Sequence, residues 1–132
     1  MKLLPLLSLS LVVLGLTPSV RAECDHPATP AELADLVEQA DQSVGRDAHR
    51  FNAAADTLAA RLPCLENLAD PALAARIHRV HGLRAFVAGK GGQTLMAFSA
   101  SRRLEVGYQF SESVFPVAHP VQRLWIQAAE QP

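Results

Sequence analysis

The apolar residues of this chain recur every three or four positions, which is the spacing of one face of an α-helix. No stretch alternates strictly between apolar and polar residues as a half-buried strand does. Alanine and leucine, which favour helices, dominate the apolar residues, and aromatic residues are few. The pattern predicts an all-α fold with four main helices and a short C-terminal one, over Pro30–Val44, Ala48–Leu62, Pro71–Ala88, Gln93–Leu104 and Val121–Ala129.

Residues that cap helices precede the first three of these segments. Thr29, Asp47 and Asp70 carry side-chain oxygens that can accept a hydrogen bond from the free N–H groups of a first helical turn. Proline follows two of them, at Pro30 and Pro71, where its fixed φ suits a helix start. These signals place the helix starts more firmly than periodicity alone does.

The segments between the predicted helices are short and rich in helix breakers. Gly89-Lys90-Gly91-Gly92 predicts a tight turn, so the helices on either side of it are expected to form an antiparallel hairpin. Gly45 ends the first helix, and a short helical piece is expected over residues 65–68. Pro116 and the proline after His119 indicate an extended stretch over residues 111–119.

Residues 1–22 have the pattern of a secretory signal peptide. A positive start is followed by the apolar run Leu3–Leu16 and by Ala22 at a cleavage position for a signal peptidase. A retained membrane helix and a lipid anchor on Cys24 are the alternatives. The apolar run is short for a membrane span, and Glu23 stands where a lipidated cysteine needs a small neighbour. The pattern predicts a protein exported to the periplasm or outside the cell, without a membrane span after cleavage.

Charge is distributed unevenly along the rest of the chain. Residues 23–70 hold ten acidic and three basic residues, whereas residues 71–132 hold three acidic and seven basic ones. One interpretation is that the two halves attract each other, and the other is that a basic face meets an anionic partner. The basic residues are not dense enough to indicate nucleic-acid binding.

Cys24 and Cys64 are the only two cysteines. An even number of cysteines in an exported chain predicts a disulfide bond. A metal pair together with His26 is the alternative, but two cysteines forty residues apart lack the close spacing of a zinc site. The bond would join the start of the exported chain to the end of the second helix.

The third and fourth predicted helices share several positions with a known helical hairpin. Gly82 and Gly89 are small residues on the first helix, and Phe98 follows Gly82 by sixteen positions, with Ser101 three residues later. Residues 75–108 therefore resemble the tetratricopeptide repeat, in which small residues on one helix receive a large side chain from the other. His78 and His81, and Val106 in place of the closing proline, depart from the repeat.

The resemblance implies a tetratricopeptide-like domain over residues 23–110 of an exported bacterial protein, followed by an extended segment and short helix over 111–132. In the repeat, the exposed side of the first helix lines a groove for extended peptides. The corresponding partner-binding residues here are Arg76, Arg79, Leu83 and Phe86. The alternative is that the apolar ones and Val87 pack on the second helix, while the arginines pair with acidic residues of the first.

No residue pattern indicates catalysis. His78 and His81 share one side of a helix and could hold a metal if a third ligand approached, but no HExxH pattern is present. The glycine turn around Lys90 lacks the Ser or Thr that ends a phosphate-binding loop. The predicted function is an exported protein–protein interaction or scaffolding module that needs no cofactor. A small metal-binding protein or enzyme using His78 and His81, or an inhibitor of a secreted enzyme, is the alternative.

Overall fold

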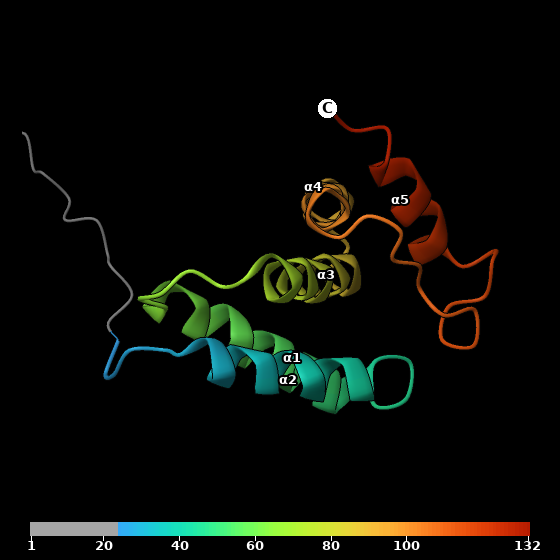
Figure 1. Cartoon of the computed structure of the whole chain (residues 1–132). Coiled ribbons are helices and arrows are strands. Elements are labelled where there is room, and N and C mark those ends of the chain that lie inside the picture. Colours follow the sequence, from blue (N-terminus) through green and yellow to red (C-terminus); the bar gives the residue numbers. More distant parts are fainter. Residues whose placement is uncertain (1–23) are drawn as a thin grey trace, which may run out of the picture.

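The computed structural model describes residues 24–132, and the predicted signal peptide lies outside this part of the chain. The described residues form five α-helices and one short 3₁₀-helix and no strand (Figure 1). The predicted all-α fold of helical hairpins is therefore confirmed for this part of the chain. The elements are α1 (Pro30–Ser43), α2 (Ala48–Arg61), η1 (Leu62–Cys64), α3 (Pro71–Val87), α4 (Gly91–Leu104) and α5 (Pro120–Ala128).

Four helix starts are capped by side chains. Thr29, Asp47 and Asp70 accept hydrogen bonds from backbone N–H groups three residues later, over 3.1, 3.0 and 2.8 Å. These three caps were predicted from the sequence and are confirmed. His119 caps α5 in a different way, because its Nδ1 accepts a hydrogen bond from the Val121 N–H over 3.1 Å. This bond requires an unprotonated Nδ1.

Three local predictions were wrong. The short helical turn lies at Leu62–Cys64 and not at residues 65–68, because Leu65 is held in extended conformation by a bridge to Ala28. Residues 111–119 form turns and not an extended stretch, since the Phe115 N–H bonds Ser111 O over 2.9 Å and the His119 N–H bonds Pro116 O over 2.8 Å. Helix α4 begins at Gly91, two residues before the predicted start at Gln93.

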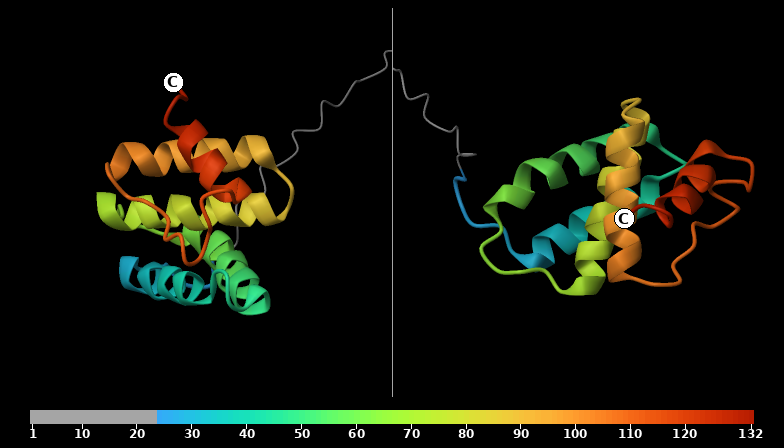
Figure 2. Two further views of the ribbon diagram at one scale, coloured as in Figure 1. Left: turned by 90° about the vertical axis from the view of Figure 1, so that its right-hand side faces the viewer. Right: turned by 90° about the horizontal axis from the view of Figure 1, so that it is seen from above.

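Two helical hairpins lie one above the other. Helices α1 and α2 form the first, and α3 and α4 the second, whose helices run across the direction of the first (Figures 1 and 2). Helix α3 contacts both α1 and α2, so it is enclosed between them and α4. Helix α5 lies beside α4 and packs against it. The segment between α4 and α5 returns along the hairpins as far as the α1–α2 turn, where Val114 lies close to Gly45.

The contact between α3 and α4 depends on Gly82. A Cβ atom at this position would lie 2.4 Å from Cδ1 and Cε1 of Phe98, which is fully buried. This packing of the large Phe98 side chain against a glycine was predicted from the sequence. On its other sides Phe98 contacts the rings of Phe110 and Trp125, with ring centroids 5.5 and 5.3 Å away. Trp125, whose docking the sequence left open, is 1% exposed.

A disulfide bond joins Cys24 to Cys64, as predicted. Beside it the Ala28 N–H donates to Cys64 O over 2.8 Å, and Arg61 pairs with Glu32 over 2.7 Å. These contacts fix the lead-in of α1 to the end of α2. None of the helices formed by residues 24–132 has both the length and the apolarity needed to cross a membrane.

Candidate functional site

Two adjoining hollows lie along the junction of α2 with the C-terminal half of α3. Asn52 of α2 and Val87 of α3 line both of them. One hollow is enclosed mainly by apolar side chains and is called here the apolar groove. The other is lined by charged and polar side chains and is called the polar cavity. Because they share a wall, a single extended ligand could occupy both.

The apolar groove has a volume of about 330 Å³. Three aromatic rings, from Phe51 of α2, Phe86 of α3 and Phe115 of the segment before α5, form much of its wall. His119 adds a fourth ring, with its centroid 5.0 Å from that of Phe115 and 6.0 Å from that of Phe86. The remaining lining residues are Val44, Gly45, Arg46, Ala48, Asn52, Leu83 and Val87. This lining suits an aliphatic or aromatic side chain.

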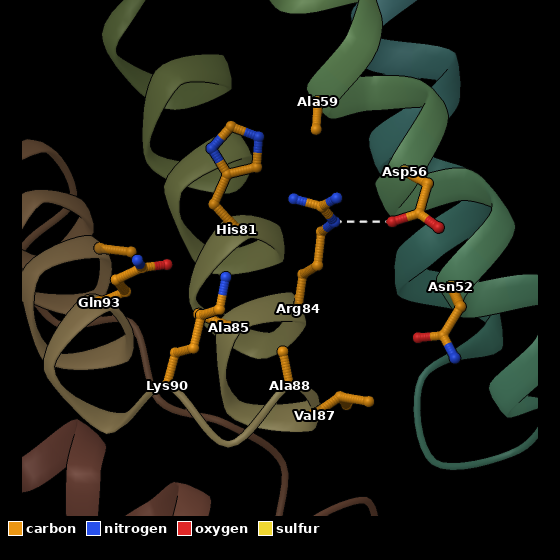
Figure 3. Close-up of a pocket in the computed structure, with 11 residues that line it drawn as sticks. Asn52, Asp56, Ala59, His81, Arg84, Ala85, Val87, Ala88, Lys90 and Gln93 are labelled. Carbon is orange, nitrogen blue, oxygen red and sulfur yellow. Dashed lines mark hydrogen bonds and ion pairs between the residues drawn. The ribbon is translucent and has the colours of Figure 1, made fainter.

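The polar cavity has a volume of about 500 Å³ and lies where α2, α3 and α4 meet. Its polar lining is drawn in Figure 3: Asn52 and Asp56 from α2, His81 and Arg84 from α3, and Lys90 and Gln93 from the following turn and α4. Alanines 59, 85, 88 and 97 complete the wall with small side chains. The small residues leave the space that the longer polar side chains reach into.

Arg84 of the polar cavity forms an ion pair. Its Nε lies 2.7 Å from Oδ1 of Asp56, and this pair links α3 to α2. Both side chains are about half exposed, at 47% and 64%, so water screens the pair and it contributes little to stability. Its main consequence is orientation, because one edge of the guanidinium group is held by the carboxylate.

His81 differs from its neighbours because it is half-buried and unpaired. Its Nε2 is buried without a hydrogen-bond partner. Burial lowers the pKa of His81 below its ordinary value of 6.5, and the nearby His78 and Arg84 lower it further. Burial also lowers the pKa of His78. Both imidazoles are therefore neutral at pH 7, and His81 contributes a polar but uncharged wall.

These lowered pKa values predict a loss of stability in mild acid. As the pH falls, histidines of the unfolded chain take up protons near pH 6.5, before His78 and His81 of the folded protein do. The contribution of His78 and His81 to the free energy of unfolding is therefore complete above pH 6.5 and is lost as the pH falls toward their folded pKa values. The free energy of unfolding, measured with urea from about pH 7 to pH 5, should fall less steeply in a His78→Gln/His81→Gln variant. His49→Gln, which removes an exposed imidazole, is the control; an equal flattening there would contradict the prediction.

The four residues predicted to bind a partner have different surroundings. Leu83 and Phe86 line the apolar groove. Arg76 lies away from it and pairs with Glu38 and Asp41 of α1 over 2.9 and 2.8 Å. Arg76 thus follows the alternative given above, in which an arginine pairs with acidic residues of the first helix.

Arg79 is only 6% exposed and lines a separate hollow together with Leu83 and Phe115. Its Nη1 lies 2.6 Å from Oε2 of Glu105 and 3.4 Å from the hydroxyl of Ser101. The ring of Tyr108 covers the guanidinium group, with 3.7 Å between Cζ and the ring centroid. Helix α4 and the residues that follow it therefore engage one terminal nitrogen and one face of the group.

The histidines that suggested a metal site have different surroundings. His81 lines the polar cavity and His78 does not. Within residues 24–132 no group of three or more His, Cys, Asp or Glu side chains is placed to hold a metal ion. The carboxylate that lines the cavity, Asp56, accepts a hydrogen bond from Arg84.

Several lining residues were not predicted as site residues. Phe115 and His119 come from a segment without helical periodicity, and no sequence pattern directs them to α3. Arg84 could have been found, because it follows His81 by three positions and so shares its side of α3. Lys90 was considered only as part of a phosphate loop, although it is the N-cap residue of α4, which lines the cavity.

The comparisons with known proteins place no constraint on this site. No family model, no curated protein and no solved structure matches the chain.

Proposed function

We propose that this protein is an exported binding module, and that its apolar groove holds one side chain of a peptide segment from a partner protein. The observation that carries the proposal is the groove itself, where the rings of Phe51, Phe86 and Phe115 and the side chain of Leu83 surround a space of about 330 Å³. A space of this size with few polar groups suits one large apolar side chain.

The surroundings of the groove favour a segment of a larger partner over a small free ligand. Val87 stands between the two hollows and is 61% exposed, so the groove opens to the surface instead of closing over a ligand. The adjoining polar cavity offers groups for the neighbouring part of the same segment. An apolar anchor beside polar contacts is the common arrangement in peptide recognition.

Export is part of the proposal. It is supported by the signal-like pattern of residues 1–22 and by the disulfide bond, which persists in oxidising compartments outside the cytosol. The disulfide restrains the start of α1 and the end of α2. The apolar groove lies at the opposite ends of these helices, near the α1–α2 turn, where it is free to contact a partner.

The proposal predicts that Val87→Glu abolishes or strongly weakens peptide binding. Peptides would be selected from a random displayed library with the disulfide-bonded protein, and their dissociation constants measured by fluorescence anisotropy. A carboxylate at the rim of the apolar groove should weaken a selected peptide by about tenfold or more, because the anchor side chain would meet a charge. Amide chemical shifts in NMR spectra would locate the bound peptide.

Met96→Glu is the matched control. Met96 is on α4 and is 73% exposed, but it lines neither hollow. It should bind selected peptides like the unaltered protein, and thermal unfolding should show that both variants fold. The proposal is wrong if no peptide is selected, or if Val87→Glu and Met96→Glu bind equally well.

A further inference from the structure

We propose that the polar cavity binds a carboxylate group, and that this carboxylate belongs to the segment whose apolar side chain occupies the adjoining groove. The second part rests on the proposed function above, whereas the first does not. The site is formed by Arg84 and Lys90 as cationic donors, with Gln93 and His81 as neutral groups beside them.

The guanidinium group of Arg84 is oriented but not saturated. Asp56 accepts only from Nε, and neither Nη1 nor Nη2 has a hydrogen-bond partner among residues 24–132. A carboxylate matches the planar, paired donors of a guanidinium group and can accept from two nitrogens at once. Asp56 therefore fixes Arg84 along one edge and leaves donors on the other edge for a ligand.

Lys90 supplies the second charge from a fixed backbone. Its N–H donates to Ala85 O over 2.9 Å, and its carbonyl accepts from the N–H and the hydroxyl of Thr94 over 3.0 and 3.1 Å. Its amine has no ion-pair partner within the described residues. Figure 3 shows this amine and the Arg84 guanidinium group extending in the same direction along α3, toward the level of His81.

The balance of charge favours a monoanion over a phosphate. Arg84 and Lys90 provide two positive charges and Asp56 one negative charge, so a single carboxylate neutralises the cavity. A phosphate dianion would leave an excess of negative charge beside Asp56. His81 adds no charge when it is neutral, and its buried, unpartnered Nε2 is a polar group for which a ligand could provide a partner.

The first experiment uses acetate as the probe, with acetamide as its uncharged counterpart and inorganic phosphate as the dianion. Lys90 is the only lysine in residues 24–132, so its side-chain NMR signal reports on the cavity directly. At constant ionic strength, acetate should give saturable shifts of Lys90 and of the amides lining the cavity. Acetamide should give none, and phosphate should bind no more tightly than acetate.

Substitutions then assign the donors. Arg84→Gln and Lys90→Gln should each weaken acetate binding by about tenfold, because each removes a charged donor. Arg123→Gln is the control, since that side chain is exposed on α5 and donates only to Ala118 O. Equal responses to acetate and acetamide, tighter binding of phosphate, or equal affinities of Arg84→Gln and Arg123→Gln for acetate would overturn the carboxylate site.

The second experiment separates a carboxylate of a bound segment from that of a free acid. Selected peptides are compared with versions in which the terminal carboxylate is amidated and side-chain carboxylates are changed to amides. One of these changes should weaken binding about tenfold in the unaltered protein and have little effect in Arg84→Gln. If acetate binds but the peptides show no such dependence, the link to the segment is wrong. If acetate binds and no peptide is selected, the proposed function fails while the carboxylate site stands.

Discussion

Gly82→Ala is expected to destabilise the protein by about 3 kcal/mol, although alanine is the better helix former by about 1 kcal/mol. The added Cβ would lie 2.4 Å from two atoms of the Phe98 ring. That ring cannot move away easily, because Phe110 and Trp125 contact it on other sides. The substitution must therefore separate α3 from α4 or displace the aromatic core. Urea unfolding followed by circular dichroism measures the change.

Gly91→Ala is the control for this prediction. Gly91 is also in a helix, and a Cβ there would have no atom within 4 Å, so its replacement should leave stability unchanged or raise it slightly. Phe98→Leu in the Gly82→Ala background should recover part of the loss, because a shorter side chain leaves room for the new methyl group. If Gly82→Ala unfolds at the same urea concentration as Gly91→Ala, the close approach of α3 and α4 is not as described.

Gly82 and Phe98 also show which parts of the fold could be predicted from the sequence. Helix starts depend on a few neighbouring residues, as at Thr29, Asp47 and Asp70, so local patterns were sufficient. A glycine on one helix leaves a space that a large side chain of the neighbouring helix must fill, so the contact within a hairpin is predictable as well.

The segment between α4 and α5 was the least predictable part. Its turns are fixed by distant groups, such as the buried Gln122 amide, which donates to Phe110 O and Phe115 O over 3.2 and 2.9 Å. The burial of Arg79 has the same origin, because Glu105 and Tyr108 enclose it only once this segment folds back over α3. A helical wheel shows where a side chain points and not what will cover it.

The candidate site was predictable only on its α3 side for the same reason. Leu83 and Phe86 were selected through the resemblance to the tetratricopeptide repeat, and both line the apolar groove. Phe115 and His119 reach the groove through the returning segment, which has no periodicity to read. Arg76 and Arg79 were the arginines predicted to bind a partner, whereas the proposed carboxylate site uses Arg84, whose terminal nitrogens have no partner among the described residues.

Removing the disulfide by the double substitution Cys24→Ser/Cys64→Ser is expected to cost about 4 kcal/mol of stability. The bond joins residues forty positions apart, and closing a loop of that length restricts the unfolded chain by about this amount. The double substitution avoids an unpaired thiol. The free energy of unfolding should fall equally when the unaltered protein is reduced, and reductant should not affect the variant.

The same variant shows whether the bond acts on the fold as a whole or on the site. Cys64 lies in η1, directly after α2, whereas the apolar groove lies at the other end of α2, near Val44 and Ala48, and the polar cavity reaches only as far as Ala59. Chain entropy in the unfolded state does not alter the folded site, so the folded variant should bind acetate and selected peptides with unchanged affinity. Weaker binding at a temperature where the variant is fully folded would mean that the bond positions α2 against α3. An unchanged urea midpoint would contradict the expected restriction of the unfolded chain by the Cys24–Cys64 bond.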